Sequence, residues 1–260
     1  MIPDAARALF PFAVDPRPHP DRAPHLAALA ELEREIVECR RCPRLVKHRE
    51  QIARERRAAY REWTYWGRPV PGFGDPDAWL CIVGLAPAAH GANRTGRMFT
   101  GDRSGDWLYR ALYRAGLANQ PQATHRDDGL RLVGAYVTAT VRCAPPANRP
   151  TPAEREACRT FLERELDALP HVRVFVTLGG FAYAHLLRVL RDRGVRIPRP
   201  TPAFRHGRVI PLSPPYRACI ASYHPSQQNT FTGKLTERMF DAVFRTALEW
   251  RPRGHRPASG

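Results

Sequence analysis

Four short apolar runs, separated by longer amphipathic segments, constrain the fold of this chain more than any other feature. The runs span residues 79–85, 135–141, 172–178 and 218–223, and each has the length of a buried strand. Helical patterns at residues 107–115, 152–169, 182–193 and 235–250 alternate with them. Strands that alternate with helices form parallel sheets covered on both faces. The sequence therefore predicts an α/β protein built on such a sheet.

The two ends of the chain differ in composition from this alternating part. Residues 1–23 are rich in proline and predict a flexible arm, whereas residues 251–260 have the composition of a disordered basic tail. Residues 25–57 carry leucine and isoleucine at helical spacing, with a break near Pro43, which predicts two helices joined by a cysteine-bearing turn. Because we find no repeat and no second boundary, residues 24–250 are predicted to form one domain.

The charge balance of the chain is strongly positive. The sequence has 41 lysines and arginines against 25 aspartates and glutamates, a formal net charge of +16. This surplus favours a polyanionic partner. All basic residues except Lys47 and Lys234 are arginines, which suit phosphate geometry, although coding bias produces the same skew. No apolar run is long enough to span a bilayer and the first 20 residues lack a signal-peptide pattern, so we expect a soluble cytoplasmic protein.

Six cysteines in an intracellular chain indicate metal ligands, catalytic groups or buried thiols rather than disulfides. Cys39 and Cys42 form a C-x2-C pair, and 14 residues separate Cys143 from Cys158. The two remaining cysteines lie inside apolar runs and are predicted to be core residues. Four thiolates fit structural zinc and an iron-sulfur cluster equally well, so spacing alone leaves the metal open.

Polar clusters follow the predicted strands. Ligands bind at the carboxyl ends of the strands in a parallel sheet, which selects residues 84–101, 142–150, 179–181 and 222–234. Three of these four segments are unusually rich in glycine, proline, asparagine, histidine or serine. Ordinary turn chemistry explains single residues of this kind, but it does not explain three clusters at one edge. We therefore predict a binding site there.

The first of these segments reads GLAPAAHGANRTGRMFTGD and contains two candidate site residues. Phe99 lies in an otherwise polar loop, where its ring either stacks on a planar base or anchors the loop to the core. Asp102 is a candidate general base or water-positioning group. It is also a suitable N-cap for the following helix, and its position alone favours the cap.

The second and third segments read RCAPPANRPTP and SYHPSQQNTFTGK. Asn148 offers a donor and an acceptor that complement the Watson–Crick edge of a pyrimidine, although its local context favours a turn asparagine. The third segment has the composition of a loop laid against a phosphate backbone. His224 is a candidate for stabilising charge on a leaving group, whereas a lone histidine is more often structural.

Taken together and in this order, the three segments resemble the motifs of the uracil-DNA glycosylase superfamily, in the family-5, or type B, branch of bacteria and archaea. The resemblance covers roughly residues 40–244. It implies three α/β/α layers around a central four-stranded parallel sheet. It also implies a structural 4Fe-4S cluster, with zinc as the less favoured alternative, held by Cys39, Cys42, Cys143 and Cys158.

The resemblance also implies roles for single residues. Asp102 matches an aspartate that acts on water, and His224 matches the histidine of the third motif. Phe99 would stack on the flipped base and Asn148 would bond its edge. Residues 86–89 lack the acidic or amide side chain of many superfamily members, which fits a dissociative path. Gly84, Leu85, Ala86 and Ala88 would line the base pocket, and the DNA contacts would come from Arg94, Ser226, Gln227, Asn229 and Lys234.

The activity implied by the resemblance is hydrolysis of the N-glycosidic bond of uracil flipped out of double-stranded DNA, which leaves an abasic site. Other deaminated bases such as hypoxanthine would also be excised. The protein would act as a monomer and would not associate with a membrane. The alternative is a non-catalytic nucleic-acid-binding protein with an iron-sulfur cluster or zinc. The ordered strand-end motifs favour the enzyme, because a protein that only binds would not need them.

Overall fold

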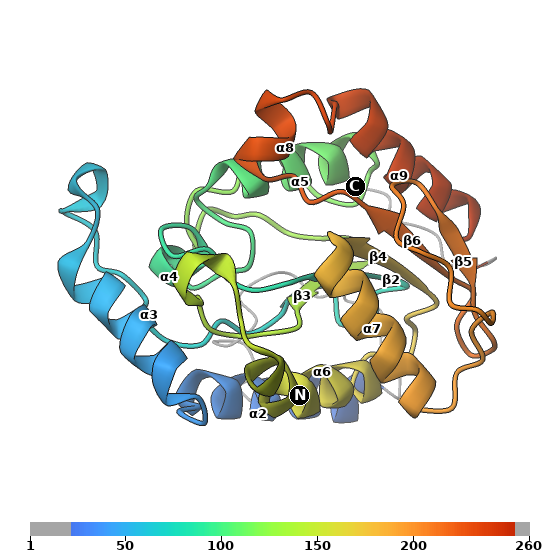
Figure 1. Ribbon diagram of the computed structural model, residues 1–260, viewed down its shortest axis with the longest axis horizontal. Coiled ribbons are helices and arrows are strands. Elements are labelled where there is room, and N and C mark those ends of the chain that lie inside the picture. The colour runs from blue at the N-terminus through green and yellow to red at the C-terminus, as the bar shows by residue number, and fades with distance from the viewer. Residues whose placement is uncertain (1–21, 253–260) are drawn as a thin grey trace.

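A sheet of six strands organises the part of the chain that the computed structural model describes, residues 22–252 (Figure 1). The strand order is β1-β3-β2-β4-β6-β5, and the four middle strands are mutually parallel. The prediction of a four-stranded parallel sheet is thus confirmed, and two short antiparallel edge strands extend it. The strands are β1 (Phe73–Gly74), β2 (Leu80–Gly84), β3 (Ala135–Ala139), β4 (Val174–Leu178), β5 (Val209–Pro211) and β6 (Ala218–Ser222).

The four middle strands are buried along their whole length, as their unbroken apolar runs predict. Their register brings the carboxyl ends level with one another. Gly84 of β2 pairs with Ala139 of β3, and Leu178 of β4 pairs with Ser222 of β6. Segments that leave the ends of these strands therefore start from one edge of the sheet.

Helices cover both faces of the sheet and give the predicted three layers. Helices α5 and α9 pack on one face, where Leu108 and Phe240 join a core cluster with Ile82 and Val176. Three helices pack on the other face through a second cluster of buried residues. The first face carries α5 (Arg103–Arg114) and α9 (Glu237–Glu249), and the second carries α2 (Arg22–Glu38), α6 (Pro152–Asp167) and α7 (Gly180–Asp192).

Shorter elements connect these layers near the strand ends. Helix α3 follows α2 after a four-residue break that contains both cysteines of the C-x2-C pair, as predicted. The predicted arm and tail lie outside the described residues, apart from residues 22, 23, 251 and 252. Within residues 22–252, no helix has both the length and the apolar character needed to cross a bilayer. The shorter elements are α3 (Pro43–Glu55), η1 (Ala58–Tyr60), α4 (Ala92–Thr95), η2 (Pro146–Asn148) and α8 (Gln227–Phe231).

Candidate active site

The polar segments identified in the sequence meet at the carboxyl edge of the parallel strands. The loop after β2 leads into α4, and β6 is followed by α8, which lies on the same side of the molecule (Figure 1). The backbone N–H of Gly179, after β4, donates to the carbonyl of Ser222 at the end of β6 over 2.8 Å. Neighbouring strands thus hold their loops together directly.

Phe99 lies against the end of β2. A Cβ on Gly84 would come within 2.8 Å of the Phe99 ring, so only glycine at this strand end allows the ring to lie so close. Phe99 has a positive φ of 52°, which is rare for an aromatic residue, and its side chain is 9% exposed. Such strained backbone is typical of functional sites. The ring is therefore held at the strand edge with a small accessible face.

His224 lies next to Phe99, on the loop that follows β6. The two ring centroids are 5.9 Å apart with an interplanar angle of 33°. A Cβ on Gly179 would be 3.5 Å from the Cβ of His224, so the end of β4 also lies close to this residue. Burial lowers the pKa of His224 to about 4, so the imidazole is neutral at neutral pH. The structure thus brings together the predicted aromatic residue and the predicted histidine.

Asp102 caps helix α5, as its position in the sequence favours. Its Oδ1 accepts from the backbone N–H of Gly105 over 3.0 Å. Its Oδ2 faces the first loop so closely that a Cβ on Gly91 would come within 1.9 Å of it. Burial raises the pKa of the Asp102 carboxyl, although backbone hydrogen bonds from Gly105 and Ser104 act in the opposite direction. Capping a helix and accepting a proton are compatible roles for this carboxylate.

Asn148 occupies an exposed turn at the rim of the edge. It ends η2 with a φ of 55°, directly after Ala147 with a φ of 52°. Asparagine tolerates this left-handed conformation better than most residues. Within residues 22–252, the Asn148 side chain forms no hydrogen bond, and no ring or polar contact joins it to Phe99 or His224. The prediction that Asn148 lies in a turn is confirmed. Its side-chain amide has no hydrogen-bond partner among residues 22–252.

The backbone after β2 continues alongside β3 beyond the strand ends. Thr140 donates from its backbone N–H to the Gly84 carbonyl over 3.0 Å and from its hydroxyl to the Leu85 carbonyl over 2.8 Å. Further on, Ala86 packs against the cluster that contains the cysteines. The Ala88 carbonyl accepts from Gly91 and Asn93. These bonds hold the predicted pocket-lining segment rigidly between β3 and α4.

The residues predicted to contact DNA on the third loop surround the start of α8. Ser226 caps this helix by accepting from the N–H of Asn229, and the Asn229 side chain donates to the His224 carbonyl over 2.9 Å. Gln227 and Lys234 are exposed, and the Lys234 Nζ lies 4.9 Å from the Tyr223 ring centroid. Asn229 and Ser226 thus position the His224 loop, while Gln227 and Lys234 face outward.

Arg94 is a correction to the predicted DNA contacts. Its side chain is only 3% exposed and donates to the carbonyls of His90 and Gly101 over 2.8 and 2.6 Å. The guanidinium lies 3.9 Å from the ring of Tyr60 and 4.1 Å from that of Trp63. Because these contacts bury it, Arg94 holds the first loop against residues 60–63 and does not face a duplex.

A contact between the start of α5 and helix α8 was not predicted from the sequence. The Arg103 Nε donates to the Thr230 hydroxyl over 3.2 Å, and the guanidinium lies 4.3 Å from the ring of Phe231. Phe231 is 64% exposed, so this pair lies at the surface of the edge. More than 120 residues separate the two partners, and no local pattern could have revealed the contact.

The four cysteines of the predicted ligand set converge in one cluster, which we call the cysteine corner. Cys143 and Cys158 are buried in a small core with Phe161, and both cysteines of the C-x2-C pair pack against it. None of the four forms a disulfide. The break between α2 and α3, the motif after β3 and helix α6 thus contribute thiols to one place. A cluster with four thiolate ligands requires this convergence.

Buried arginines surround the cysteine corner. Arg49 is 2% exposed, and its Nη1 donates to the Cys143 Sγ over 2.9 Å and to the Cys39 carbonyl over 3.2 Å. Arg142 forms a buried ion pair with Glu165 at 2.5 Å. A buried cation that donates to a sulfur suits an anionic thiolate better than a neutral thiol. The donor set therefore fits an anionic metal cluster.

A compact site for a single ion is not formed in the described part of the chain. No group of three or more His, Cys, Asp or Glu side chains there is arranged to hold one metal ion.

The cysteine corner is also connected to the active-site edge. Arg44 of α3 makes two hydrogen bonds of 2.8 and 2.7 Å with Glu154 of α6 and donates to the Arg149 carbonyl. These bonds hold the Asn148 turn between the two regions.

Comparison with known proteins agrees with this architecture. The sequence model of the uracil DNA glycosylase superfamily matches residues 71–248. A type-5 uracil-DNA glycosylase of Mycobacterium bovis is 53% identical over 85% of this chain and 81% of its own length. Two further type-5 enzymes, from Mycobacterium leprae and Thermus thermophilus, are each 52% identical over 85% and 82% of this chain and 94% and 93% of their own.

The parallel sheet, the three strand-end loops and these matches define a single class. The chain belongs to the uracil-DNA glycosylase superfamily, in its type-5 branch, and it is a glycosylase. The resemblance inferred from the three motifs is thereby confirmed. The alternative of a non-catalytic nucleic-acid-binding protein gains no support.

Proposed function

We propose that this protein hydrolyses the N-glycosidic bond of uracil in double-stranded DNA and leaves an abasic site. The observation that carries the proposal is the pairing of Phe99 with a neutral, half-buried His224 at the carboxyl edge of the sheet. A base flipped into this edge would stack on the Phe99 ring, because stacking is the general way in which aromatic side chains hold unpaired bases. The same base would then lie beside the imidazole.

His224 stabilises the departing base in this proposal. When the bond between C1′ of the sugar and N1 of uracil breaks, its electron pair moves onto the base, and negative charge develops on N1 and the carbonyl oxygens. A neutral imidazole carries one ring N–H, and this group can donate a hydrogen bond to such an oxygen. A preorganised donor in a water-poor site is most effective where charge develops. The lowered pKa keeps His224 in this donor form at neutral pH.

Asp102 acts later, on the water that captures the sugar cation. The water oxygen forms the new bond to C1′, and its proton passes to the carboxylate or to bulk water. The raised pKa makes Asp102 a stronger base than an exposed aspartate, and the hydrogen bond from Gly105 fixes its orientation. The small side chains of residues 86–89 place no second acid near the sugar. Departure of the base therefore limits the rate.

We further propose that Asn148 reads the edge of the flipped base, and that the pocket accepts hypoxanthine as well as uracil. An exposed amide without a partner among the described residues is available to donate to one base atom and accept from another. The backbone of Gly84, Leu85, Ala86 and Ala88 lines the pocket in this proposal. The alanine side chains leave room for a larger purine.

The cysteine corner would hold a structural 4Fe-4S cluster, with zinc as the less favoured alternative. Cys39, Cys42, Cys143 and Cys158 would be its ligands, and the cluster would cross-link three chain segments. Arg49 keeps its hydrogen bond to the Cys143 sulfur and offsets the negative charge there. Since Asn148 follows Cys143 by five residues, the corner would fix the position of the Asn148 turn.

The protein would bind duplex DNA as a monomer in the cytoplasm, with Ser226, Gln227, Asn229 and Lys234 on its DNA-facing loop. The net charge of +16 supports a polyanionic partner.

The direct test of the proposed function uses purified protein and a duplex with one uracil opposite guanine. Alkali cleaves the strand at abasic sites, so uracil release is read as a shortened strand. We expect cleavage of the uracil strand, slower cleavage of a hypoxanthine duplex and none of an undamaged duplex. Intact strands after prolonged incubation with excess enzyme would contradict the proposal.

A further inference from the structure

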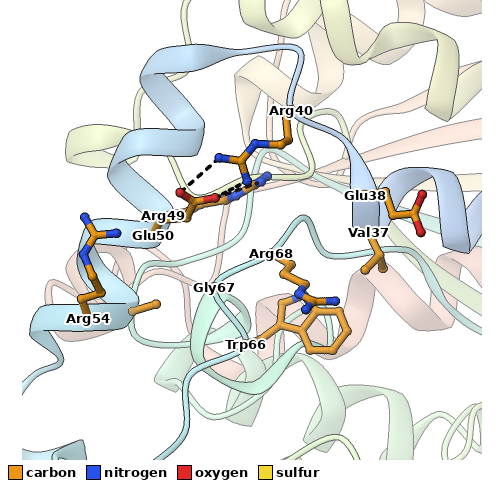
Figure 2. A pocket seen from close by; sticks show the side chains of 10 residues that line it. Val37, Glu38, Arg40, Arg49, Glu50, Arg54, Trp66, Gly67 and Arg68 are labelled. Atoms are coloured by element: carbon orange, nitrogen blue, oxygen red, sulfur yellow. Dashed lines mark hydrogen bonds and ion pairs between the residues drawn. The ribbon is translucent and has the colours of Figure 1, made fainter.

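A pocket of about 540 Å³ lies between the end of α2, helix α3 and the segment 66–68 (Figure 2). It is separate from the strand-edge site, and none of the residues assigned to catalysis lines it. Its charged lining consists of four arginines and two glutamates, Arg40, Arg49, Arg54, Arg68, Glu38 and Glu50. The pocket therefore has a surplus of positive charge.

Two of these charges neutralise each other. The Arg40 Nη1 and the Glu50 Oε1 are 2.5 Å apart, and this contact lowers the pKa of the Glu50 carboxyl (Figure 2). By contrast, Arg54 and Arg68 are exposed, and neither forms an ion pair with another residue in the range 22–252. Two guanidinium groups at the pocket mouth are thus available to an anion.

Arg49 is a third arginine of the pocket lining, but its guanidinium is committed to neighbouring groups. Its Nη1 donates to the Cys143 Sγ and to the Cys39 carbonyl, and its Nη2 lies 3.8 Å from the Glu50 carboxylate. Its Nε is buried and out of reach of a molecule in the pocket. Of the arginines that line the pocket, Arg54 and Arg68 therefore remain for an anion.

The pocket is built directly onto the first loop of the active site. The backbone N–H groups of Trp66 and Gly67, in its wall, donate to the carbonyls of Arg94 and Asn93 in α4 over 2.9 and 3.0 Å. A duplex that presents its target base to this loop therefore runs close to the pocket. Arginine is the side chain best suited to phosphate oxygens, because its planar fork donates two parallel hydrogen bonds.

We propose that this pocket binds one backbone phosphate of the DNA duplex, outside the flipped nucleotide, through Arg54 and Arg68. The inference rests on the proposed function for the identity of the polyanion. Free inorganic phosphate has the same chemistry as a backbone phosphate, so the experiment must separate the two sources.

The test measures affinity for an undamaged duplex as a function of salt concentration. We compare the wild type with Arg54→Ala/Arg68→Ala and with the control Arg196→Ala/Arg217→Ala. The control removes two equally exposed charges near the amino ends of the strands. Loss of one phosphate contact should flatten the plot of log K against log salt by about 0.9 and weaken binding several-fold at low salt. The control should keep the wild-type slope within error.

An unchanged slope in the pocket variant, or an equal change in both variants, would overturn the proposal. A second arm titrates inorganic phosphate at constant ionic strength and follows the melting temperature. If phosphate stabilises the wild type alone while the DNA slopes agree, the pocket binds a free anion and the assignment to the DNA backbone is wrong. Because binding is measured on undamaged DNA, failure of uracil release would overturn the proposed function without deciding this result.

Discussion

The strand-edge site and the cysteine corner are built from different kinds of interaction. At the edge, a ring, an imidazole and backbone hydrogen bonds are held by the ends of parallel strands, as Phe99 and His224 illustrate. At the corner, buried charges and four thiols from distant segments meet, and Arg49 donates to a cysteine sulfur. The edge is thus stabilised by the fold itself, whereas the corner gathers charges that a bound anionic cluster would balance.

The two regions therefore differ in role: the strand edge carries the chemistry, and the cysteine corner supports the structure. Burial keeps His224 neutral, so the edge provides a hydrogen-bond donor for a departing base. The corner touches the same loop through Cys143 and through Arg44, which donates to the Arg149 carbonyl. Damage at the corner should therefore affect folding and the Asn148 turn together, while damage at the edge should affect rate in a protein that remains folded.

The largest expected effect follows from breaking the corner. In Cys143→Ser one ligand is lost and Arg49 loses its sulfur acceptor, so we expect loss of brown colour, of bound iron and of most soluble protein. Absorbance near 400 nm and iron content measure the outcome. Cys81→Ala, which alters a thiol in the core of β2, should keep its colour. A colourless, zinc-containing and fully active wild-type preparation would contradict the iron-sulfur proposal.

The pH dependence tests the edge. Because burial lowers the pKa of His224 from its ordinary value near 6.5 to about 4, the donor form should persist to mildly acidic pH. Single-turnover rates should stay level from about pH 8 to 5 and fall toward pH 4. The Asp102→Asn variant should show the same acid limb, which would assign the limb to His224. An acid limb centred near pH 6.5 would show that His224 is not desolvated.

The same shift makes a prediction about stability. Between the folded and unfolded pKa values, the unfolded chain binds more protons at His224 than the folded protein does. The contribution of this residue to the free energy of unfolding is therefore complete above pH 6.5 and is lost as the pH falls toward 4. Denaturant titrations of the wild type and His224→Ala should converge across that interval, and parallel curves would contradict the assignment.

A smaller effect is expected at the Asn148 turn. Asn148→Ala removes hydrogen bonds to the flipped base and should lower the single-turnover rate by about 10- to 100-fold, equivalent to the loss of one or two such bonds. The ratio of uracil to hypoxanthine excision should change as well. Asn148→Gly, which also suits the left-handed backbone, separates the loss of the amide from backbone strain. If Asn148→Gly retains the wild-type rate and base preference, the amide does not read the base.

The smallest predicted effect concerns Lys234, whose exposed ammonium follows α8. Lys234→Ala should reduce affinity for duplex DNA slightly and flatten the salt dependence by at most about one charge. The rate at saturating enzyme should be nearly unchanged, since the residue touches no reacting group in this account. A salt slope identical to that of the wild type would place the DNA on another face.

Sequence patterns located the middle strands well because continuous burial leaves a continuous apolar run. All four lie within two residues of their predicted starts and ends. The edge strands β1 and β5 were missed, because two or three residues carry no periodicity. Residues joined through local chemistry, such as the Asp102 cap, were also predictable.

Contacts between distant segments were not predictable in the same way. Arg94 was expected to face DNA, but the rings of Tyr60 and Trp63 enclose it, and nothing in its own loop indicates this. The contact of Arg49 with Cys143 also joins distant segments, although its place two helical turns after Cys42 is a signal that could have been used. The fate of a charged side chain depends on what packs over it, which the local sequence does not encode.

The most direct test of the account compares single-turnover uracil release by His224→Ala and Asp102→Asn, with duplex binding measured alongside. Stabilisation of the departing base predicts that His224→Ala lowers the chemical rate by about 10²–10³, the usual loss for one preorganised donor to developing charge. Asp102→Asn should lose less, because amide capping of α5 persists and water capture follows the slow step. A full rate in His224→Ala together with an inactive Asp102→Asn would contradict the account and make Asp102 the principal base.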